Sequence, residues 1–264
     1  MRNNLVIGDT SQISYYFPEN FVKISSRNID YNNLTKFEWD RIFVCVGESR
    51  KFIQNIEIYN QVNYELVLSI IKRFKGCSNK IIIYSTCELW NKCDGPISID
   101  MDFDFYETPY LLSKYKITKK IIENPSEFSN VILIYPFNFN SPYRTNEFLF
   151  GKIFSSLIER KTIEIGDTYF YRDLIHPKFL VNESINSQNH KIVGSGRMVY
   201  INDFIRDLYS NFDINYDEYV VENRQTFIEY EKRKEFYLKS DKEVYNYNEL
   251  LTDTLNDIKK YKRI

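Results

Sequence analysis

Residues 81–120 read IIIYSTCELWNKCDGPISIDMDFDFYETPYLLSKYKITKK. The stretch opens with the apolar, β-branched run Ile81–Ile83, which predicts a buried strand. The polar sequence STCE at 85–88 follows this strand, and DGP at 94–96 marks a loop. An amphipathic helix is expected from about residue 109 to residue 123. The segment therefore predicts a strand, a loop and a helix, with polar side chains where the strand ends.

Tyr110 and Lys114 stand at i and i+4 near the start of the predicted helix, so their side chains share one helix face. An ammonium group beside a phenol favours the phenolate, which makes Tyr110 a usable base. In a chain with 22 tyrosines, a Tyr-x-x-x-Lys pattern alone is expected by chance. Thr86 and Glu88 at the strand end add a hydroxyl and a carboxylate, and this combination favours a catalytic site. Glu88 also has a structural interpretation, as a cap or an ion-pair partner.

Strands and helices are expected to alternate around this segment. Strands are expected at 4–8, 22–25, 42–46 and 131–135, and helical segments at 52–75 and 109–123. This alternation predicts an α/β fold, a Rossmann-like doubly wound parallel sheet, over residues 1–138. A small C-terminal α+β lobe is expected over 139–264, with a return of the chain to the sheet near 165–195. Within the lobe, helices are expected at 148–160, 200–212 and 247–260, and short strands at 163–165 and 191–194.

The first predicted strand is followed by GDTSQIS, in which Gly8, Ser11 and Ser14 occupy the three positions of a G-x-x-G-x-x-G loop. Such a loop needs small residues so that backbone N–H groups and a helix N-terminus can approach a pyrophosphate. Serine is small, and its hydroxyl can donate a hydrogen bond to phosphate. A phosphate loop and an ordinary turn are both open interpretations. Arg27, just past the second strand, is either a contact to the 2′-phosphate of NADP or a surface arginine.

The composition indicates a globular protein of 264 residues with a net charge of −1. This balance does not suggest a nucleic-acid partner. No apolar run approaches the roughly 18 residues of a membrane span, and residues 1–4 do not lead into a signal peptide, so we expect a cytoplasmic protein without a membrane partner. Cys45, Cys77, Cys87 and Cys93 show no CxxC spacing, and the two histidines form no ligand pair with them. Four free thiols and no metal site are expected.

Several short blocks, in order along the chain, resemble the extended short-chain dehydrogenases, the NAD-dependent epimerases and dehydratases that act on nucleotide sugars. The blocks are GDTSQIS at 8–14, STCELW at 85–90, PYLLSK at 109–114, FNFNSP at 137–142, FLFGKI at 148–153 and RDLIHPK at 172–178. Within the family the likeness is greatest to the GDP-mannose 4,6-dehydratases, whose counterparts read GITGQDG, STSELY, PYxxxK, FNHESP, FVTRKI and RDWGHAK. The spacing from Thr86 to Tyr110 is similar as well.

The resemblance implies a role for each matching position. Tyr110 would be the catalytic base and acid, and Lys114 would hold the nicotinamide ribose and favour the phenolate of Tyr110. Thr86 would hydrogen-bond the sugar 4-hydroxyl, and Glu88 would be the acid/base that distinguishes dehydratases from simple oxidoreductases. The residues implied for the cofactor are Gly8, Thr10, Ser11, Gln12, Ile13, Arg27 and Lys114, and those implied for the nucleotide diphosphate are Asn138, Lys152 and Arg172.

The expected function is therefore that of a nucleotide-sugar 4,6-dehydratase with NADP or NAD as cofactor, NADP being slightly favoured by Arg27. Its expected partners are a nucleotide-diphosphate sugar and further copies of the chain, as a homodimer or higher homo-oligomer paired through the helices at 52–75 and 109–123. Two alternatives stay open. One is an epimerase or 4-ketoreductase of the same family, in which Glu88 is structural. The other is a non-catalytic nucleotide-sugar-binding protein with a decayed cofactor loop.

Overall fold

The computed structural model describes residues 3–50, 53, 55–223 and 235–261. Its contacts divide the chain into two compact units, each assembled from segments that are separate in the sequence. Unit 1 comprises Met1–Lys92, Ile99–Pro136 and Val181–Val193, and unit 2 comprises Cys93–Ser98, Phe137–Leu180 and Gly194–Ile264. The helix α6 (Pro177–Asn186) is shared, because the division falls after Leu180.

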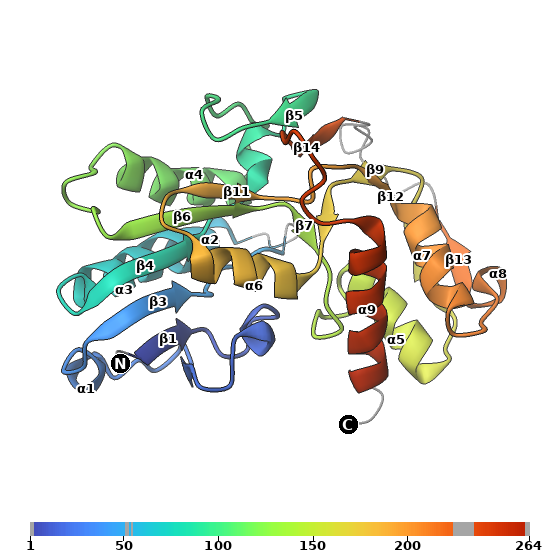
Figure 1. The fold of residues 1–264 in the computed structure, drawn as a ribbon, viewed down its shortest axis with the longest axis horizontal. Helices are drawn as coiled ribbons and strands as arrows, with labels where there is room; N and C mark the ends of the chain where they lie inside the picture. The colour runs from blue at the N-terminus through green and yellow to red at the C-terminus, as the bar shows by residue number, and fades with distance from the viewer. Residues whose placement is uncertain (1–2, 51–52, 54, 224–234, 262–264) are drawn as a thin grey trace. The chain divides into compact units, whose positions relative to one another are not determined.

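Unit 1 is built on a six-stranded parallel sheet with the order β11-β6-β4-β3-β1-β2. The strands are β1 (Asn3–Ile7), β2 (Val22–Ile24), β3 (Trp39–Val44), β4 (Ser78–Tyr84), β6 (Val131–Pro136) and β11 (Lys191–Val193). Figure 1 shows β11, β6, β4, β3 and β1 following one another in this order. Every residue of β6 is buried, as expected of a strand covered on both faces. The predicted Rossmann-like fold is confirmed.

The strand order reverses at β1, which has β2 on one side and β3 on the other. At such a switch point the two connections leave in opposite directions and open a crevice beyond the carboxyl ends of the strands. In this chain, the segments that follow β1 and β3 begin at Gly8 and Cys45. They are therefore the place where the fold itself predicts a ligand.

The helical segment predicted over 52–75 is continuous from residue 56 to residue 74 but not uniform. It consists of α2 (Ile56–Asn60), a π-helical turn η2 (Gln61–Leu66) and α3 (Val67–Phe74). In α3 the buried residues are Val67, Ile70, Ile71 and Phe74, the i, i+3, i+4, i+7 pattern of one apolar face. The other helical elements of the unit are η1 (Ser14–Tyr16), α1 (Tyr31–Leu34), η3 (Cys87–Trp90) and α4 (Pro109–Ile122). A π-helical turn inside a helix often marks a functional position.

Unit 2 contains small two-stranded pairings. They are β7 (Asn138–Phe139) with β10 (Leu174–Ile175), β9 (Tyr171–Arg172) with β12 (Val199–Tyr200), β8 (Ile163–Ile165) with β13 (Val220–Glu222), and β5 (Gly95–Ile97) with β14 (Phe236–Leu238). Its helices are α5 (Leu149–Glu159), α7 (Ile201–Ser210), α8 (Tyr216–Tyr219) and α9 (Tyr247–Tyr261). The DGP sequence predicted a loop, yet Gly95–Ile97 is a strand, because a partner much later in the chain supplies its hydrogen bonds.

Asp173 joins three segments of unit 2. Its buried carboxylate accepts hydrogen bonds from the backbone N–H and hydroxyl of Ser195 at 2.7 and 2.8 Å, from the N–H of Gly196 at 3.2 Å and from the N–H of Leu238 at 3.0 Å. Burial raises the pKa of Asp173, although these hydrogen bonds favour the charged form. A Cβ on Gly194 would come within 2.6 Å of the Asp173 carboxylate, so only glycine fits there. The acid of the RDLIHPK block is therefore a structural group.

His176, in the same block, anchors the last helix of unit 2. Its Nε2 lies 2.9 Å from Oδ2 of Asp257 on α9, and its Nδ1 accepts the backbone N–H of Lys178 at 3.2 Å. The N–H of Lys178 can only donate, so the hydrogen of a neutral His176 ring is on Nε2 and faces Asp257. The ring is 1% exposed. His176 thus has a structural function within unit 2.

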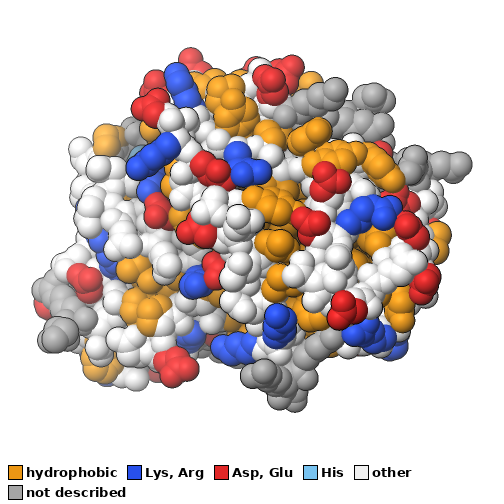
Figure 2. All heavy atoms as spheres, turned by 45° about the vertical axis from the view of Figure 1, so that its right-hand side comes forward, with side chains coloured by type: hydrophobic (Ala, Val, Ile, Leu, Met, Phe, Trp, Pro, Cys, Tyr) orange, Lys and Arg blue, Asp and Glu red, His pale blue; other side chains and the backbone are white. Residues whose placement is uncertain are grey.

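None of the helices in the described residues is long and apolar enough to cross a membrane. The cysteines at 45, 77, 87 and 93 are free thiols, as predicted. On the face drawn in Figure 2, Lys and Arg side chains alternate with Asp and Glu, and no extended area of that face carries one sign of charge.

Candidate functional site

Gly8 ends β1 in a conformation that only glycine adopts readily. Its φ is +105°, and a Cβ at this position would lie 2.6 Å from the carbonyl oxygen of Cys45, which follows β3. The glycine therefore allows the ends of β1 and β3 to approach each other at the switch point. The first glycine of the predicted phosphate loop is required by the structure itself.

The rest of the loop is held by its own hydrogen bonds. The hydroxyl of Ser14 is completely buried and donates to the backbone carbonyls of Asp9 at 2.5 Å and Ser11 at 2.6 Å. The expectation that this serine donates to a phosphate is wrong, because the hydroxyl hydrogen is already used inside the loop. The helical turn that follows, η1, has only three residues, so it adds little helix dipole.

Other groups in the loop fit a dinucleotide. In the described part of the chain, the backbone N–H groups of Gln12 and Ile13 meet no acceptor. In addition, Oδ1 of Asp9 and Oε1 of Gln12 are buried without a hydrogen-bond partner in the structure. Unused N–H groups after a strand can bind a pyrophosphate, and unused buried acceptors can take the hydroxyl groups of a ribose. Between Asp9 and Gln12, Thr10 is exposed and Ser11 is half-buried.

Arg27 is exposed three residues after β2. Its backbone N–H donates to Oγ of Ser25 at 3.3 Å, which shapes the turn at the strand end. A guanidinium in this position is able to pair with a phosphate group that lies over the end of β2. Both interpretations of Arg27 from the sequence stay predictions.

Thr86 and Ser85 end β4 with different functions. The hydroxyl of Ser85 pairs with that of Thr118 on α4 at 2.8 Å, and both groups are buried. Thr86 is the N-cap of η3, and its Oγ1 accepts the N–H of Glu88 at 3.2 Å. Accepting this bond leaves the hydroxyl hydrogen of Thr86 for donation. Thr86 therefore keeps a hydroxyl hydrogen that this bond does not use, whereas Ser85 joins the helix to the strand.

Lys114 is buried on α4, with 6% of the residue exposed. Its Nζ donates to the carbonyl of Tyr84 at 2.9 Å and would lie 3.1 Å from a Cβ on Gly47, so glycine leaves space for the ammonium group. Burial lowers the pKa of Lys114 to about 8. A lysine with this pKa is still mainly charged at neutral pH but loses its proton readily above it.

Tyr110 lies one turn before Lys114, as the second residue of α4. The helix is capped by Thr108, whose Oγ1 accepts the N–H of Leu111 at 3.2 Å. The half-buried ring of Tyr110 meets that of Tyr59 edge to face, with centroids 6.4 Å apart.

Asn63 is a component of the site that the sequence did not indicate. It is completely buried in the π-helical turn, where its Oδ1 accepts the N–H of Glu48 at 2.7 Å and its Nδ2 donates to the carbonyl of Glu48 at 3.0 Å. The same Nδ2 donates to Oγ of Ser113 at 2.9 Å. The hydroxyl of Ser113 in turn donates to the carbonyl of Tyr110 at 2.6 Å. Asn63 therefore joins the segment after β3 to the turn of α4 that holds Tyr110 and Lys114.

Glu88 lies in η3, two residues after Thr86, and is half-buried. Its Oε2 lies 3.4 Å from Nδ2 of Asn91. Trp90, in the same turn, is 1% exposed, and its Nε1 donates to the carbonyl of Met101 at 3.0 Å. Trp90 is therefore a core residue, whereas Glu88, in the same turn, keeps part of its side chain exposed.

The three residues predicted to bind the nucleotide diphosphate belong to unit 2. Asn138 pairs with Leu174 across β7 and β10, two residues from Arg172. The guanidinium of Arg172 lies 4.4 Å from the ring centre of Phe170 and donates to the carbonyl of Tyr171 at 2.8 Å. Lys152 on α5 donates to the carbonyl of Glu164 at 2.9 Å, a bond that a bound phosphate would have to replace or share.

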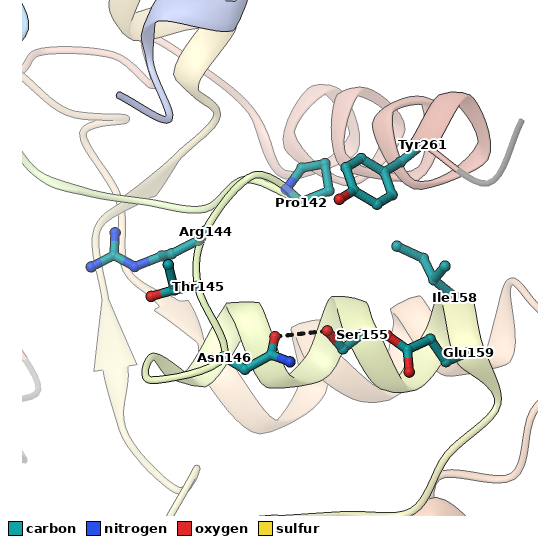
Figure 3. Close-up of a pocket in the computed structure, with 8 residues that line it drawn as sticks. All are labelled: Pro142, Arg144, Thr145, Asn146, Ser155, Ile158, Glu159 and Tyr261. Atoms are coloured by element: carbon teal, nitrogen blue, oxygen red, sulfur yellow. Dashed lines mark hydrogen bonds between the residues drawn. The ribbon is translucent and has the colours of Figure 1, made fainter. Parts of the chain in front are cut away.

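A cavity of about 340 Å³ lies elsewhere in unit 2 and holds none of the predicted residues. It is lined by Pro142, Arg144, Thr145, Asn146, Ser155, Ile158, Glu159 and Tyr261. In Figure 3, Tyr261 lies beside Pro142, while Ser155 and Glu159 face the cavity from α5. Its polar groups already have partners, since Ser155 donates to Asn146 at 2.7 Å and Glu159 pairs with Lys161 at 2.7 Å.

No protein-family model matches the sequence, and no curated protein matches it. Solved structures share the fold over nearly the whole chain. The UDP-N-acetylglucosamine 4-epimerase of Methanobrevibacter ruminantium is 15% identical, with a TM-score of 0.77 over 98% of this chain and 99% of its own. A dTDP-glucose 4,6-dehydratase of Streptomyces venezuelae, a double mutant with NAD bound, is 14% identical, with a TM-score of 0.77 over 100% and 98%. The protein RMD of Pseudomonas aeruginosa, complexed with NADPH, is 15% identical, with a TM-score of 0.76 over 98% and 99%. At these identities the similarity is one of fold.

Proposed function

We propose that this chain is a nucleotide-sugar 4,6-dehydratase of the extended short-chain dehydrogenase type, with a GDP-mannose-like substrate. One observation carries the proposal. Thr86 and Glu88 occupy a single turn at the end of β4, and Lys114 donates to the carbonyl of Tyr84 just before that turn. A hydroxyl donor, a carboxylate and a Tyr/Lys pair are thus attached to one strand end.

Each of these residue types has a defined task in the reaction. Tyr110, as the phenolate, accepts the proton of the sugar 4-hydroxyl while Thr86 donates a hydrogen bond to the 4-oxygen. The resulting 4-keto group makes the C5 proton acidic. Glu88 removes that proton and protonates the departing 6-hydroxyl, which leaves as water. Lys114 favours the phenolate of Tyr110 throughout.

A nicotinamide dinucleotide would supply the hydride chemistry at C4 and C6. The residues that would hold it are Gly8, Thr10, Ser11, Gln12 and Ile13 in the loop after β1, Lys114 at the nicotinamide ribose, and Arg27 at the adenosine end. The unused N–H groups of Gln12 and Ile13 and the unpartnered acceptors of Asp9 and Gln12 support this assignment. Arg27 favours NADP over NAD, because a guanidinium can pair with a 2′-phosphate.

The nucleotide diphosphate is assigned to Asn138, Lys152 and Arg172. Two of these side chains are cationic, as two phosphates require, and both now contact backbone carbonyls or an aromatic ring. The arginine and proline with which the resembling family contacts the nucleotide have no clear counterpart in the sequence of residues 224–234, which lie outside the described residues.

The proposal is tested with the purified protein and a panel of nucleotide sugars. Denatured protein is first analysed by mass spectrometry for released dinucleotide. The protein is then incubated with each sugar and NADP or NAD, and the products are analysed for a mass loss of one water. We expect a 4-keto-6-deoxy product from at least one sugar. Absence of dinucleotide binding at millimolar concentration would overturn the proposal.

A second candidate is a nucleotide-sugar epimerase or 4-ketoreductase on the same fold. It is supported by the contact between Glu88 and Asn91, which gives the carboxylate a structural partner. Here the product would keep the mass of the substrate or gain two hydrogens. Glu88→Gln separates the two reactions, because only the dehydratase needs the carboxylate.

A further inference from the structure

Asn91 follows the η3 turn directly and is 2% exposed. Its Oδ1 accepts the backbone N–H of Tyr106 at 2.7 Å, and its Nδ2 lies 3.4 Å from Oε2 of Glu88. Its own backbone N–H donates to the carbonyl of Glu88 at 3.1 Å. One buried residue therefore contacts Glu88 through both its backbone and its side chain.

The orientation of the Asn91 amide is fixed by its neighbours. A backbone N–H only donates, so the atom of Asn91 that faces Tyr106 must be the oxygen, and the NH₂ group must face Glu88. The Tyr106 segment is itself fastened to the turn, because Asp104 donates to the carbonyl of Leu89 at 3.0 Å and accepts the N–H of Lys92 at 3.1 Å. Rotation of the amide would break the bond to Tyr106.

We infer that Asn91 is a positioning residue that presents an NH₂ donor to Glu88 and holds its carboxylate in one orientation at the end of β4. A hydrogen bond donated to a carboxylate favours the ionised form, which is the form that removes a proton. A contact of 3.4 Å before substrate binds is consistent with this role, because such bonds are often long in the free enzyme. The catalytic meaning of the inference rests on the proposed function, whereas the contact between Asn91 and Glu88 does not.

Lys92 and Asp104 are charged residues on the segments joined to this turn, as are Asp94, Asp102 and Glu107. Lys92 and Asp104 pair with each other at 3.4 Å, and both side chains are exposed. None of these residues is changed in the variants below.

The test is Asn91→Asp. This variant keeps an oxygen for the N–H of Tyr106 and the size of the side chain, but it places a second carboxylate next to Glu88. Two carboxylates in contact share a proton, so the titration midpoint of Glu88 should rise by about one pH unit or more. It is measured by NMR on protein with carboxyl-labelled glutamate, in which Glu88→Gln identifies the resonance. Asn20→Asp, an exposed position, adds the same charge elsewhere.

Asn91→Ser is the second variant, because it removes the donor without adding a charge and should raise the midpoint by a smaller amount. If the Glu88 midpoint in Asn91→Asp and in Asn91→Ser equals that in Asn20→Asp, the inference is overturned. In the pH profile of turnover, the acidic midpoint of water elimination should move to higher pH in Asn91→Asp. Hydride exchange at C4 should be unchanged. A wild-type protein without turnover would reject the proposed function, and the NMR titration would still decide on Asn91. If the wild type is active and the acidic midpoint of Asn91→Asp equals that of the wild type, the role of Asn91 is rejected.

Discussion

The ammonium nitrogen of Lys114 lies 2.9 Å from the carbonyl oxygen of Tyr84, so α4 is tied to β4 at the residue before Ser85. The hydroxyl pair of Ser85 and Thr118, at 2.8 Å, joins the same two elements. These two buried bonds hold the helix with Tyr110 against the strand that ends in Thr86. The candidate catalytic residues therefore keep their arrangement because a helix and a strand are fastened together, not because a loop is ordered.

Lys114→Met should abolish turnover. The pKa of buried Lys114 is about 8, below its ordinary 10.5, so charging this lysine costs stability. The loss of unfolding free energy is greatest below pH 8 and disappears above pH 10.5. Between these values the unfolded chain binds more protons than the folded one, so stability rises with pH. Relative to Lys114→Met, the wild type should therefore gain up to about 3 kcal/mol of unfolding free energy as the pH rises through this window.

The measurement is urea unfolding of both proteins at several pH values from 7 to 10.5. Titration of all other groups is common to the two proteins and cancels in the difference. A difference in unfolding free energy that does not change with pH would contradict the buried, charged state of Lys114. Activity is measured separately, at neutral pH.

Tyr110→Phe should lower turnover by a factor of roughly 100 to 10,000, because it removes the acid/base hydroxyl. The ring is half-buried and is kept in the variant, so the unfolding free energy should change by less than about 0.5 kcal/mol. Tyr115→Phe, on the same helix, is the matched control and should leave turnover unchanged. Equal losses in both variants would show that the helix was disturbed and that Tyr110 has no specific role.

Gly8→Ala should destabilise the protein by about 2–4 kcal/mol. The φ of +105° is unfavourable for alanine, and the new Cβ would meet the carbonyl of Cys45 at 2.6 Å. Gly76→Ala is the control, because nothing lies within 4 Å of a Cβ there and its φ is not positive. It should be neutral or stabilise by up to about 1 kcal/mol. Similar thermal unfolding of the two variants would contradict the close approach of β1 and β3.

Asn63→Ala should cost about 2–3 kcal/mol of unfolding free energy, because it leaves the N–H and carbonyl of Glu48 without their partner. It should also lower turnover, since Ser113 and the turn with Tyr110 lose their link to β3. Asn186→Ala removes an exposed asparagine with one side-chain bond and should change stability by less than about 0.5 kcal/mol. Urea unfolding of both variants gives the comparison. An Asn63→Ala protein as stable as the control would contradict the bridging role.

The long elements of the fold could be predicted from the sequence because their patterns are local. The β-branched run at Ile81–Ile83 lies inside β4, and the apolar spacing in 52–75 corresponds to helix from residue 56 to residue 74. The strand Gly95–Ile97 was not predictable, because it exists only through pairing with Phe236–Leu238. Its local sequence, DGP, favours a turn.

The residues of the candidate site also divide into those with a local sequence signal and those without one. Thr86, Glu88, Tyr110 and Lys114 could be proposed together because they flank one predicted strand and one predicted helix. Asn63 could not, since a single asparagine in a helical segment carries no signal until the fold places Glu48 and Ser113 around it. The bonds of the Ser14 hydroxyl could not be predicted, because its two acceptors are backbone carbonyls of its own loop, and a sequence gives no signal for such bonds.

Glu88→Gln tests the central claim most directly. The variant protein is given the nucleotide sugar that the wild type converts, and two quantities are followed: exchange of the C4 hydrogen and release of the 4-keto-6-deoxy product. Glu57→Gln, an exposed glutamate on α2, is the control and should behave as the wild type. We predict that Glu88→Gln keeps C4 exchange and loses product formation by a factor of roughly 100 or more. Product formation at the wild-type rate would contradict the assignment of Glu88 and, with it, the proposed dehydratase.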